Sequence, residues 1–277
     1  MNLRCGKRTL DCSFPRIMAV LNVTPDSFYD GGTCYQNGVL QLDAVLRRAD
    51  TLLQEGADLL DVGGESTRPN ADTVSTQEEC DRVLPVLEAV VSRFDTVVSV
   101  DTSNPVVIRE ASRLGAGFIN DVRALQVPGA LDEVVASGLP VCLMHMQGSP
   151  GSMQDRPEYT DAVQEVYGFL SQRRAVCMAA GMAPNQLVFD PGIGFGKTDE
   201  HNLALLENLA RFTGLGVVLL GVSRKSLFGR LLGRDIDERL PGSLATGLLG
   251  CQKGARILRV HDVAATRDVL RMWQLIG

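Results

Sequence analysis

Residues 97–121 read VVSVDTSNPVVIREASRLGAGFIND, and this stretch decides the fold class. One apolar run ends in Asp101, and a second apolar run ends in Asn120 only 19 positions later. Between them, Asn104 and Pro105 are typical of the first residues of a helix, and a glycine follows where the helix would end. The interval is just long enough for one helix and a return strand. The stretch therefore predicts a strand, a helix and a second, parallel strand.

The same ending recurs along the chain. Eight short apolar runs stop at a polar or ionisable residue, namely Asn22, Asp61, Asp101, Asn120, His145, Asp190, Ser223 and His261. Fully buried parallel strands read as short continuous apolar runs. When such strands close into a barrel, the catalytic and ligand-binding residues lie at their carboxyl ends. One pattern thus predicts both a fold and the position of the site.

Helical periodicity fills the intervals between these runs, over residues 42–53, 75–91, 131–136, 163–180, 201–209, 244–252 and 266–275. Alternation of strands and helices is typical of βαβ units and a parallel sheet. An open doubly wound sheet is the alternative, but eight units without a composition break favour a closed (β/α)8 TIM barrel. We expect a single domain over residues 1–277, in which residues 1–14 form a short N-terminal hairpin that covers the barrel floor.

Composition narrows the class of protein. Hydrophobic residues make up 45% of the 277 residues and charged residues 22%, which is ordinary for a globular protein with a large core. A net charge of −6 argues against nucleic-acid binding. No apolar stretch approaches the length that crosses a membrane, and the seven cysteines are scattered, without a CxxC pair. We therefore expect a cytoplasmic protein with reduced thiols.

Eight segments, in order along nearly the whole chain, resemble the motifs of the dihydropteroate synthase family. They are LNVTPDSFYDGG (21–32), DVGGESTRPNA (61–71), VSVDTS (98–103), FINDVRAL (118–125), LMHMQGSP (143–150), FDPGIGFGKT (189–198), GVSRKS (221–226) and RVHDV (259–263). The resemblance implies a (β/α)8 transferase of folate biosynthesis. Such enzymes join 6-hydroxymethyl-7,8-dihydropterin pyrophosphate to 4-aminobenzoate, which gives 7,8-dihydropteroate and pyrophosphate. It also implies a sulfonamide target and a homodimer.

By this resemblance, Asp101, Asn120 and Asp190 bind the pterin. A pterin presents an amino group and a ring N–H along one edge, and a carboxylate such as Asp190 can accept both hydrogen bonds. Asn120 can donate and accept on the remaining edge. One such residue alone would more often cap a strand or helix, but three on one rim favour ligand binding. Met144 and Phe195 resemble residues that line the pterin slot.

Basic groups lie at the ends of the last two predicted strands. Lys225 resembles a residue that reaches the pterin ring and borders the aminobenzoate site, where Ser223 would hold the carboxylate at a helix N-terminus. A solvated basic turn is the alternative for this arginine–lysine pair. Arg259 and His261 lie on one face of a strand, and a buried cation there needs an anion. By resemblance both contact the pyrophosphate, Thr67 adds a hydroxyl, and Arg259 stacks beside the pterin.

Asn22 resembles the residue that coordinates Mg²⁺ together with pyrophosphate oxygens. A single neutral ligand suits magnesium, which often combines few protein ligands with water and substrate phosphate. Two long, turn-rich loops leave the predicted rim, and long loops there are often functional lids. The resemblance places Phe28 and Pro69 against the aminobenzoate ring and Arg68 over the site.

The substrate implies a mechanism. The bond that breaks joins pyrophosphate to a methylene conjugated with the pterin ring, so departure of pyrophosphate can leave a delocalised cation. The family is thought to react in this dissociative way, with Arg259 and His261 stabilising the leaving group, Asp101 the electron-poor ring, and the amine attacking afterwards. The residues predicted to be catalytic are Asp101, Lys225 and Arg68. No nucleophilic serine or cysteine is required.

Two other functions remain open at this point. Corrinoid-linked methyltetrahydrofolate methyltransferases share a pterin-binding barrel, but they would not carry loops built for aminobenzoate and pyrophosphate. A non-catalytic pterin-binding subunit should lack phosphate- or metal-binding residues. Phe28, Lys225 and the Arg259/His261 pair favour the synthase.

Three further predictions concern packing. His145 also ends a strand, but it matches no ligand of the family, and we expect a satisfied core histidine. The segment 244–249 and the tail around Trp273 are candidate dimer surfaces, although packing within the chain would explain each of them.

Overall fold

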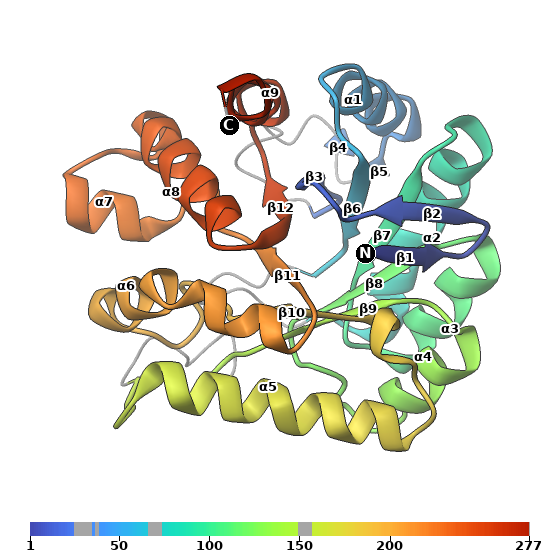
Figure 1. Ribbon diagram of the computed structural model, residues 1–277. Helices are drawn as coiled ribbons and strands as arrows, with labels where there is room; N and C mark the ends of the chain where they lie inside the picture. Colours follow the sequence, from blue (N-terminus) through green and yellow to red (C-terminus); the bar gives the residue numbers. More distant parts are fainter. Residues whose placement is uncertain (25–34, 37–38, 66–73, 149–156, 277) are drawn as a thin grey trace.

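The computed structural model describes residues 1–24, 35–36, 39–65, 74–148 and 157–276. Eight parallel strands close into a barrel (Figure 1), in the order β3 (Arg16–Asn22), β6 (Leu59–Gly63), β7 (Val97–Asp101), β8 (Phe118–Asp121), β9 (Val141–Met144), β10 (Leu187–Asp190), β11 (Val217–Leu220) and β12 (Ala255–Val260). Strand β12 pairs with β3 and closes the ring. The predicted (β/α)8 barrel is confirmed, and the open doubly wound sheet is excluded.

Helices surround this barrel: α1 (Leu42–Gln54), α2 (Thr76–Arg93), α3 (Pro105–Leu114), α4 (Ala130–Ser137), α5 (Ala162–Ala179), α6 (Asp199–Glu207), α7 (Ser226–Leu232), α8 (Leu240–Gln252) and α9 (Val263–Ile276). Two hairpins lie outside the barrel sheet, β1 (Asn2–Cys5) with β2 (Arg8–Asp11) and β4 (Tyr35–Gln36) with β5 (Val39–Leu40). Short 3-10 turns span Pro184–Gln186, Leu209–Gly214 and Ile236–Glu238. In the described part of the chain, no helix has both the length and the apolar character needed to cross a membrane.

Local sequence explains the ends of α3 and the start of α2. Asn104 Oδ1 accepts a first-turn amide hydrogen bond at 3.0 Å, Pro105 takes the first helical position, and Gly115 ends α3 at a φ of 102°. Ser75 caps α2 in the same way, because its hydroxyl accepts a hydrogen bond from the Glu78 amide at 3.2 Å. Both predicted helix starts are confirmed.

Helices α8 and α9 begin four and three residues before their predicted starts, and the sequence pattern misses α7, which is too short for a periodic signal. Helix α8 begins at Leu240 rather than Leu244. The intervening proline and glycine look like a break, but Pro241 lies in the first turn, where its missing N–H costs nothing. Gly242 is required there, since a Cβ would lie 2.8 Å from the Phe228 ring.

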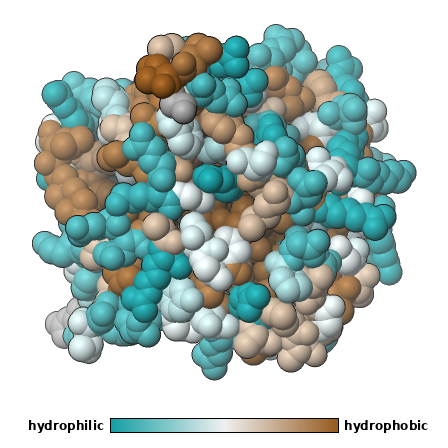
Figure 2. Space-filling view, in the orientation of Figure 1, coloured by the Kyte–Doolittle hydropathy of each residue, from teal (hydrophilic) through white to brown (hydrophobic). Residues whose placement is uncertain are grey.

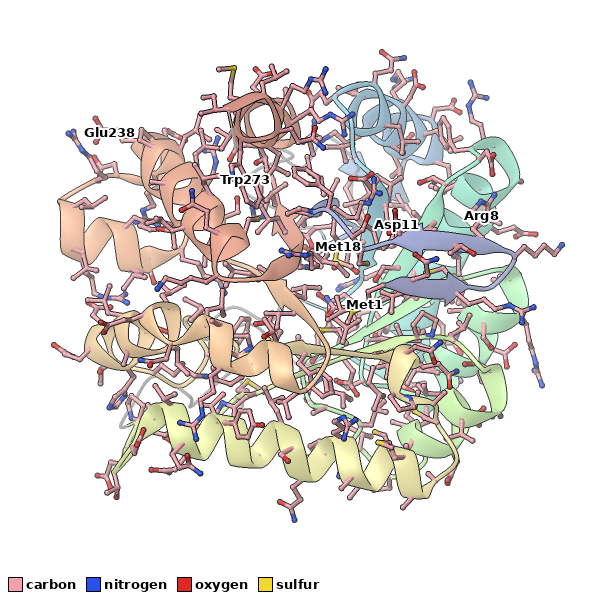
Figure 3. The ribbon with its side chains drawn as sticks, in the orientation of Figure 1. Met1, Arg8, Asp11, Met18, Glu238 and Trp273 are labelled. Carbon is pink, nitrogen blue, oxygen red and sulfur yellow. The ribbon has the colours of Figure 1, made fainter. Side chains whose placement is uncertain are left out.

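The amino-terminal hairpin covers one end of the barrel (Figures 1 and 3). Leu3, Cys5 and Leu10 are buried on one face of this hairpin. They form a cluster with residues from all eight barrel strands, Met18 and Phe118 among them. The predicted hairpin and its place on the barrel floor are therefore confirmed. The carboxyl ends of the strands form the opposite rim.

Strand register brings polar side chains to one level of that opposite rim. Asn22 pairs with Gly63, Gly63 with Asp101, and Asp101 with Asn120, across four adjacent strands. Paired residues on neighbouring strands project to the same side of the sheet. These three polar side chains therefore lie at the same end of the barrel and on the same side of the sheet.

Candidate active site

An ion-paired arginine ties three strands together at the rim. Arg259 on β12 donates from Nε to Asp61 Oδ2 at 2.6 Å and from Nη2 to Asp101 Oδ2 at 2.8 Å. Asp61 is fully buried and also accepts hydrogen bonds from Asn120 Nδ2, at 3.1 Å, and from Ser99 Oγ. Two carboxylates of the protein thus supply the counter-charge for Arg259 that the sequence argument assigned to pyrophosphate.

This cluster shifts the pKa values of its members. Burial raises the pKa of Asp101 to about 7; Arg259 opposes the rise, and the carboxylates of Asp61 and Asp121 add to it. Burial works against the charge on Arg259, but Asp61 and Asp101 outweigh it and raise the pKa of the guanidinium. Arg259 therefore stays charged, while Asp101 titrates near neutral pH.

Asp190 ends β10 and is followed by a loop that contains three closely spaced glycines. Its Oδ1 accepts a hydrogen bond from the Gly192 amide at 2.7 Å. Gly192 has a φ of 69°, and a Cβ there would lie 1.9 Å from the carbonyl oxygen of His145, so only glycine fits. Burial raises the pKa of Asp190, whereas the Gly192 amide and Lys225 favour its charged form.

Lys225 stands at the start of α7 and contacts the loop after β10. Its Nζ lies 4.1 Å from the centre of the Phe195 ring, a cation–π contact. Burial lowers the pKa of Lys225 to about 8; Asp190 opposes this shift, and Arg259 adds to it. Asp190, Phe195 and Lys225 thus belong to one cluster that also feels the charge of Arg259.

Ser223 and His261 form the next contact along the rim. The Ser223 hydroxyl lies 3.2 Å from both the backbone nitrogen and Nδ1 of His261. The neighbouring Arg224 points elsewhere, because its Nε donates to Asp262 Oδ2 at 2.7 Å. The arginine–lysine pair is therefore not a solvated basic turn: Arg224 is held in an ion pair, and Lys225 joins the site.

Asn22 ends β3 at the level of Asp101, and Gly63 of β6 lies between them. A Cβ on Gly63 would lie 3.6 Å from Asn22 Oδ1 and 3.8 Å from Asp101 Oδ2, so glycine at this position keeps a gap between two oxygen atoms. Oxygen donors of this kind are those that Mg²⁺ prefers, with water or substrate oxygens completing its octahedron. Asn22 therefore offers one oxygen of the kind that a magnesium ion takes, whereas Asp101 Oδ2 already accepts a hydrogen bond from Arg259.

Four predicted site residues, Phe28, Thr67, Arg68 and Pro69, lie outside the described residues. Met144 ends β9, with 4% of its surface exposed. The structure brings the remaining predicted residues to the same end of the barrel: Asn22, Asp101, Asn120, Asp190, Phe195, Ser223, Lys225, Arg259 and His261. Their roles toward a ligand stay predictions.

Sequence reasoning gives no role to two residues of this region. Asp61 ends an apolar run just as Asp101 does, but no pattern shows that Arg259, 198 positions away, binds it. Lys197 sits in a glycine-rich turn, where a lysine is usually solvated, yet only 1% of it is exposed and its Nζ lies 3.0 Å from His145 Nδ1. The prediction that His145 is a satisfied core histidine is confirmed.

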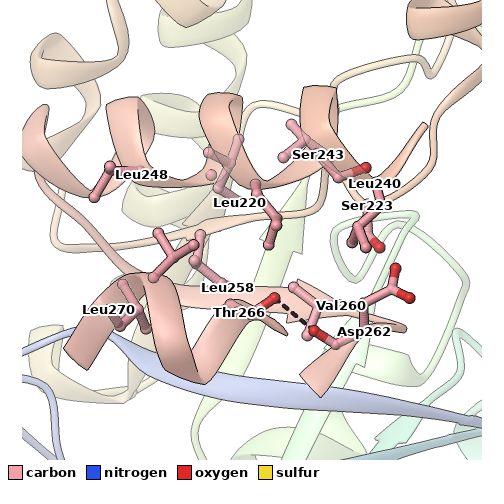
Figure 4. Close-up of a pocket in the computed structure, with 14 residues that line it drawn as sticks. Leu220, Ser223, Leu240, Ser243, Leu248, Leu258, Val260, Asp262, Thr266 and Leu270 are labelled. Atoms are coloured by element: carbon pink, nitrogen blue, oxygen red, sulfur yellow. Dashed lines mark hydrogen bonds between the residues drawn. The ribbon is translucent and has the colours of Figure 1, made fainter. Parts of the chain in front are cut away.

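A cavity of about 10 Å³ lies between α8, α9 and strands β11 and β12 (Figure 4). Leu244, Leu248 and Ser223 contribute to its lining. It has room for about one water molecule, so it is a packing gap rather than a substrate site. Leu244 and Leu248 therefore pack within the chain, as does Trp273, whose ring lies 5.5 Å from that of Phe14.

Comparison with known proteins agrees with this geometry. The family described as pterin binding enzyme matches residues 18–261. The dihydropteroate synthase of Haemophilus influenzae is 52% identical over 275 residues, which are 99% of this chain and 98% of that protein.

Two solved structures share the fold. The dihydropteroate synthase of Yersinia pestis, in a sulfonamide drug complex, has a TM-score of 0.94 and 47% identity, over 99% of this chain and 98% of that one. The enzyme of Xanthomonas albilineans with 4-aminobenzoic acid has a TM-score of 0.91 and 48% identity, over 99% of this chain and 97% of that one. The chain belongs to the pterin-binding enzymes and, among them, to the dihydropteroate synthase family.

Proposed function

We propose that the rim just described condenses 6-hydroxymethyl-7,8-dihydropterin pyrophosphate with 4-aminobenzoate, the reaction of a dihydropteroate synthase. The observation that carries this proposal is the meeting of Asp190, Lys225 and the Arg259–Asp101 pair at one end of the barrel. These groups supply a carboxylate acceptor, a lysine ammonium and a fixed guanidinium within one cluster. A flat, polar heterocycle that carries an anionic leaving group needs each of them.

The pterin edge would be recognised by Asp190 and Asn120. Asp190 accepts the hydrogen bonds of the ring N–H and the amino group, and Lys225 reaches the ring oxygen or nitrogen. Asp61 holds Nδ2 of Asn120 at 3.1 Å, which fixes the direction in which the amide presents its donor and acceptor. Met144 and Phe195 would line the slot.

The pyrophosphate would lie toward His261 and Arg259, with Thr67 as a further contact from outside the described residues. Asn22 would hold Mg²⁺ together with the phosphate oxygens. When bound, this ion neutralises charge on the leaving group and so favours its departure. Because Arg259 already satisfies two carboxylates, its guanidinium is oriented before the substrate arrives.

The reaction would proceed by loss of pyrophosphate from the pterin methylene, followed by attack of the aminobenzoate nitrogen. The carboxylates of Asp101 and Asp190 stabilise positive charge that spreads over the ring. Ser223 would hold the carboxylate of aminobenzoate, and Phe28, Arg68 and Pro69 would close over it. This residue assignment follows the sequence resemblance and the shared rim.

The assay that tests this function mixes the purified chain with both substrates and magnesium. We expect 7,8-dihydropteroate and pyrophosphate in equal amounts, and both products should depend on each substrate. Binding of pterin without turnover would instead indicate a non-catalytic pterin-binding subunit. Methyl transfer from methyltetrahydrofolate would indicate the corrinoid-linked class. Either outcome would end the assignment.

The pH dependence of kcat/KM for the pterin substrate should be bell-shaped. Asp101, with a pKa of about 7, must lose its proton to stabilise a cationic ring, so the rate constant rises as the pH passes 7. Lys225, with a pKa of about 8, must keep its proton, so the rate constant falls above pH 8. Asp101→Asn should flatten the acidic limb, and Lys225→Arg should move the basic limb upward. A profile that neither substitution changes would contradict these roles.

We propose a homodimer in which apolar side chains on α7 and the following turn meet a second copy. Leu231, Leu232 and Ile236 are between 40% and 56% exposed, and Leu249 of α8 is 55% exposed. Figure 2 shows an apolar patch over α7. Leu232→Glu should shift sedimentation equilibrium toward monomer, whereas a wild-type protein that stays monomeric at micromolar concentration would refute the dimer.

A cytoplasmic location stays a prediction.

A further inference from the structure

Lys197 is a buried lysine whose direct partners are all uncharged. Its Nζ lies 2.9 Å from the carbonyl oxygens of Gly192 and Phe195, 3.2 Å from that of His145, and 3.0 Å from His145 Nδ1. An ammonium has three N–H groups, and the carbonyl oxygens can only accept. The charged lysine can therefore donate one N–H to each of the three carbonyl oxygens. The lone pair of His145 Nδ1 is a further acceptor within reach.

Keeping this charge in the interior has a cost. Burial lowers the pKa of Lys197 to about 7, although Asp190 opposes the shift. A methionine would fill a similar volume without that cost. The same burial, with Lys197 nearby, lowers the pKa of His145 to about 3, so the imidazole stays neutral and can accept.

The loop between Asp190 and Lys197 needs support because its glycines give it few side chains to pack. Asn202, which is fully buried, accepts a hydrogen bond from the Gly194 amide at 2.7 Å. The Tyr159 hydroxyl donates to the Gly196 carbonyl at 2.8 Å. These two contacts hold an amide and a carbonyl of the loop. Lys197 gathers two further carbonyls of the loop and joins them to the end of β9.

We propose that Lys197 is a positioning residue, which holds Asp190 and Phe195 in the geometry that binds substrate by tying the carbonyls of Gly192 and Phe195 to His145. The proposal rests on the function proposed above. It follows from two short connections. Gly192 donates its amide to Asp190, and Phe195 lies under the Lys225 ammonium. Release of the loop would therefore disturb both the pterin acceptor and the wall beside it.

Kinetics of Lys197→Met test this role. We expect KM for the pterin substrate to rise by about tenfold or more with a smaller change in kcat, because misplaced binding groups weaken capture of substrate before chemistry. Lys197→Gln keeps two N–H donors and should recover part of the loss. Lys253→Met is the matched control, since it also removes a lysine bonded to a backbone carbonyl, that of Glu207 at 2.8 Å, and should leave KM unchanged.

A pH series separates positioning from loss of general stability. Asp190 is faced by Lys197, Lys225 from α7, Arg259 from β12 and the Gly192 amide. Without the Lys197 charge, the pKa of Asp190 should rise further. When the solution is acidified, the variant should therefore lose affinity for the pterin at a higher pH than the wild type does. An unchanged KM and an unchanged pH series in folded Lys197→Met would overturn the proposal, and Lys197→Gln serves the same comparison if the methionine variant does not fold. Wild-type protein without turnover would instead overturn the proposed function.

Discussion

Asp190→Asn is expected to lower kcat/KM for the pterin substrate by about two to three orders of magnitude. A hydrogen bond to a charged group contributes about 1.5–3 kcal/mol, and roughly 1.4 kcal/mol is a factor of ten. The variant would lose one such bond outright, because its N–H₂ group faces a donor of the pterin, and its neutral carbonyl oxygen would accept the other bond without the help of a negative charge. Lys225 would also lose the negative charge of Asp190, which opposes the lowering of its pKa.

The measurement is steady-state kinetics with varied pterin substrate, together with a binding titration in the absence of aminobenzoate. Asp95→Asn is the matched control, since it makes the same chemical change at an exposed acid that pairs with Arg8 of the floor hairpin. Its kinetics should equal those of the wild type. A loss of less than about fivefold in Asp190→Asn would show that this carboxylate does not recognise the pterin.

Arg259→Met is expected to destabilise the folded protein by about 3–5 kcal/mol at pH 8, because removal of one partner leaves buried carboxylates uncompensated. Asp101 already has a pKa raised to about 7, and loss of Arg259 would raise it further. A carboxyl with a raised pKa in the folded state takes up a proton that the unfolded chain releases. The defect should therefore be small at pH 5.5 and grow as the pH rises toward 8.5.

Denaturant unfolding at those two pH values measures this effect. Arg256→Met on the same strand is the control, because its guanidinium donates to the carbonyls of Cys251 and Ala255. Its effect should be about 0.5 kcal/mol and similar at both pH values. Two results would contradict this account: the free energy of unfolding of Arg259→Met falls by less than about 1 kcal/mol at pH 8.5, or it falls by the same amount at pH 5.5 and pH 8.5. Either result would show that the ion pairs of Arg259 with Asp61 and Asp101 do not stabilise the fold as described.

The barrel fold and the polar residues at the carboxyl ends of its strands could be predicted from the sequence, because both depend on local periodicity. A run such as residues 97–100 ends at Asp101 whichever partner the strand finds, and strand register then places Asn22, Asp101 and Asn120 at the same level of the barrel. The start of α8 was harder to place, since Pro241 gives the same local signal in a first turn as in a loop.

The side-chain partnerships could not be predicted in this way. The counter-ion of Arg259 is decided by which acids the closed barrel brings within reach, and Asp61 lies 198 positions away along the chain. Lys197 is buried because the loop folds back onto His145, which depends on a close approach that only Gly192 permits. Periodicity carries no information on contacts of that kind.

A crystal structure of the chain with the pterin pyrophosphate tests the central claim most directly. We expect the amino group and ring N–H of the pterin to lie within hydrogen-bond distance of Asp190, with Lys225 at the ring and the phosphates toward His261. A pterin bound away from these side chains, or a ring edge facing solvent while Asp190 contacts only the protein, would contradict it.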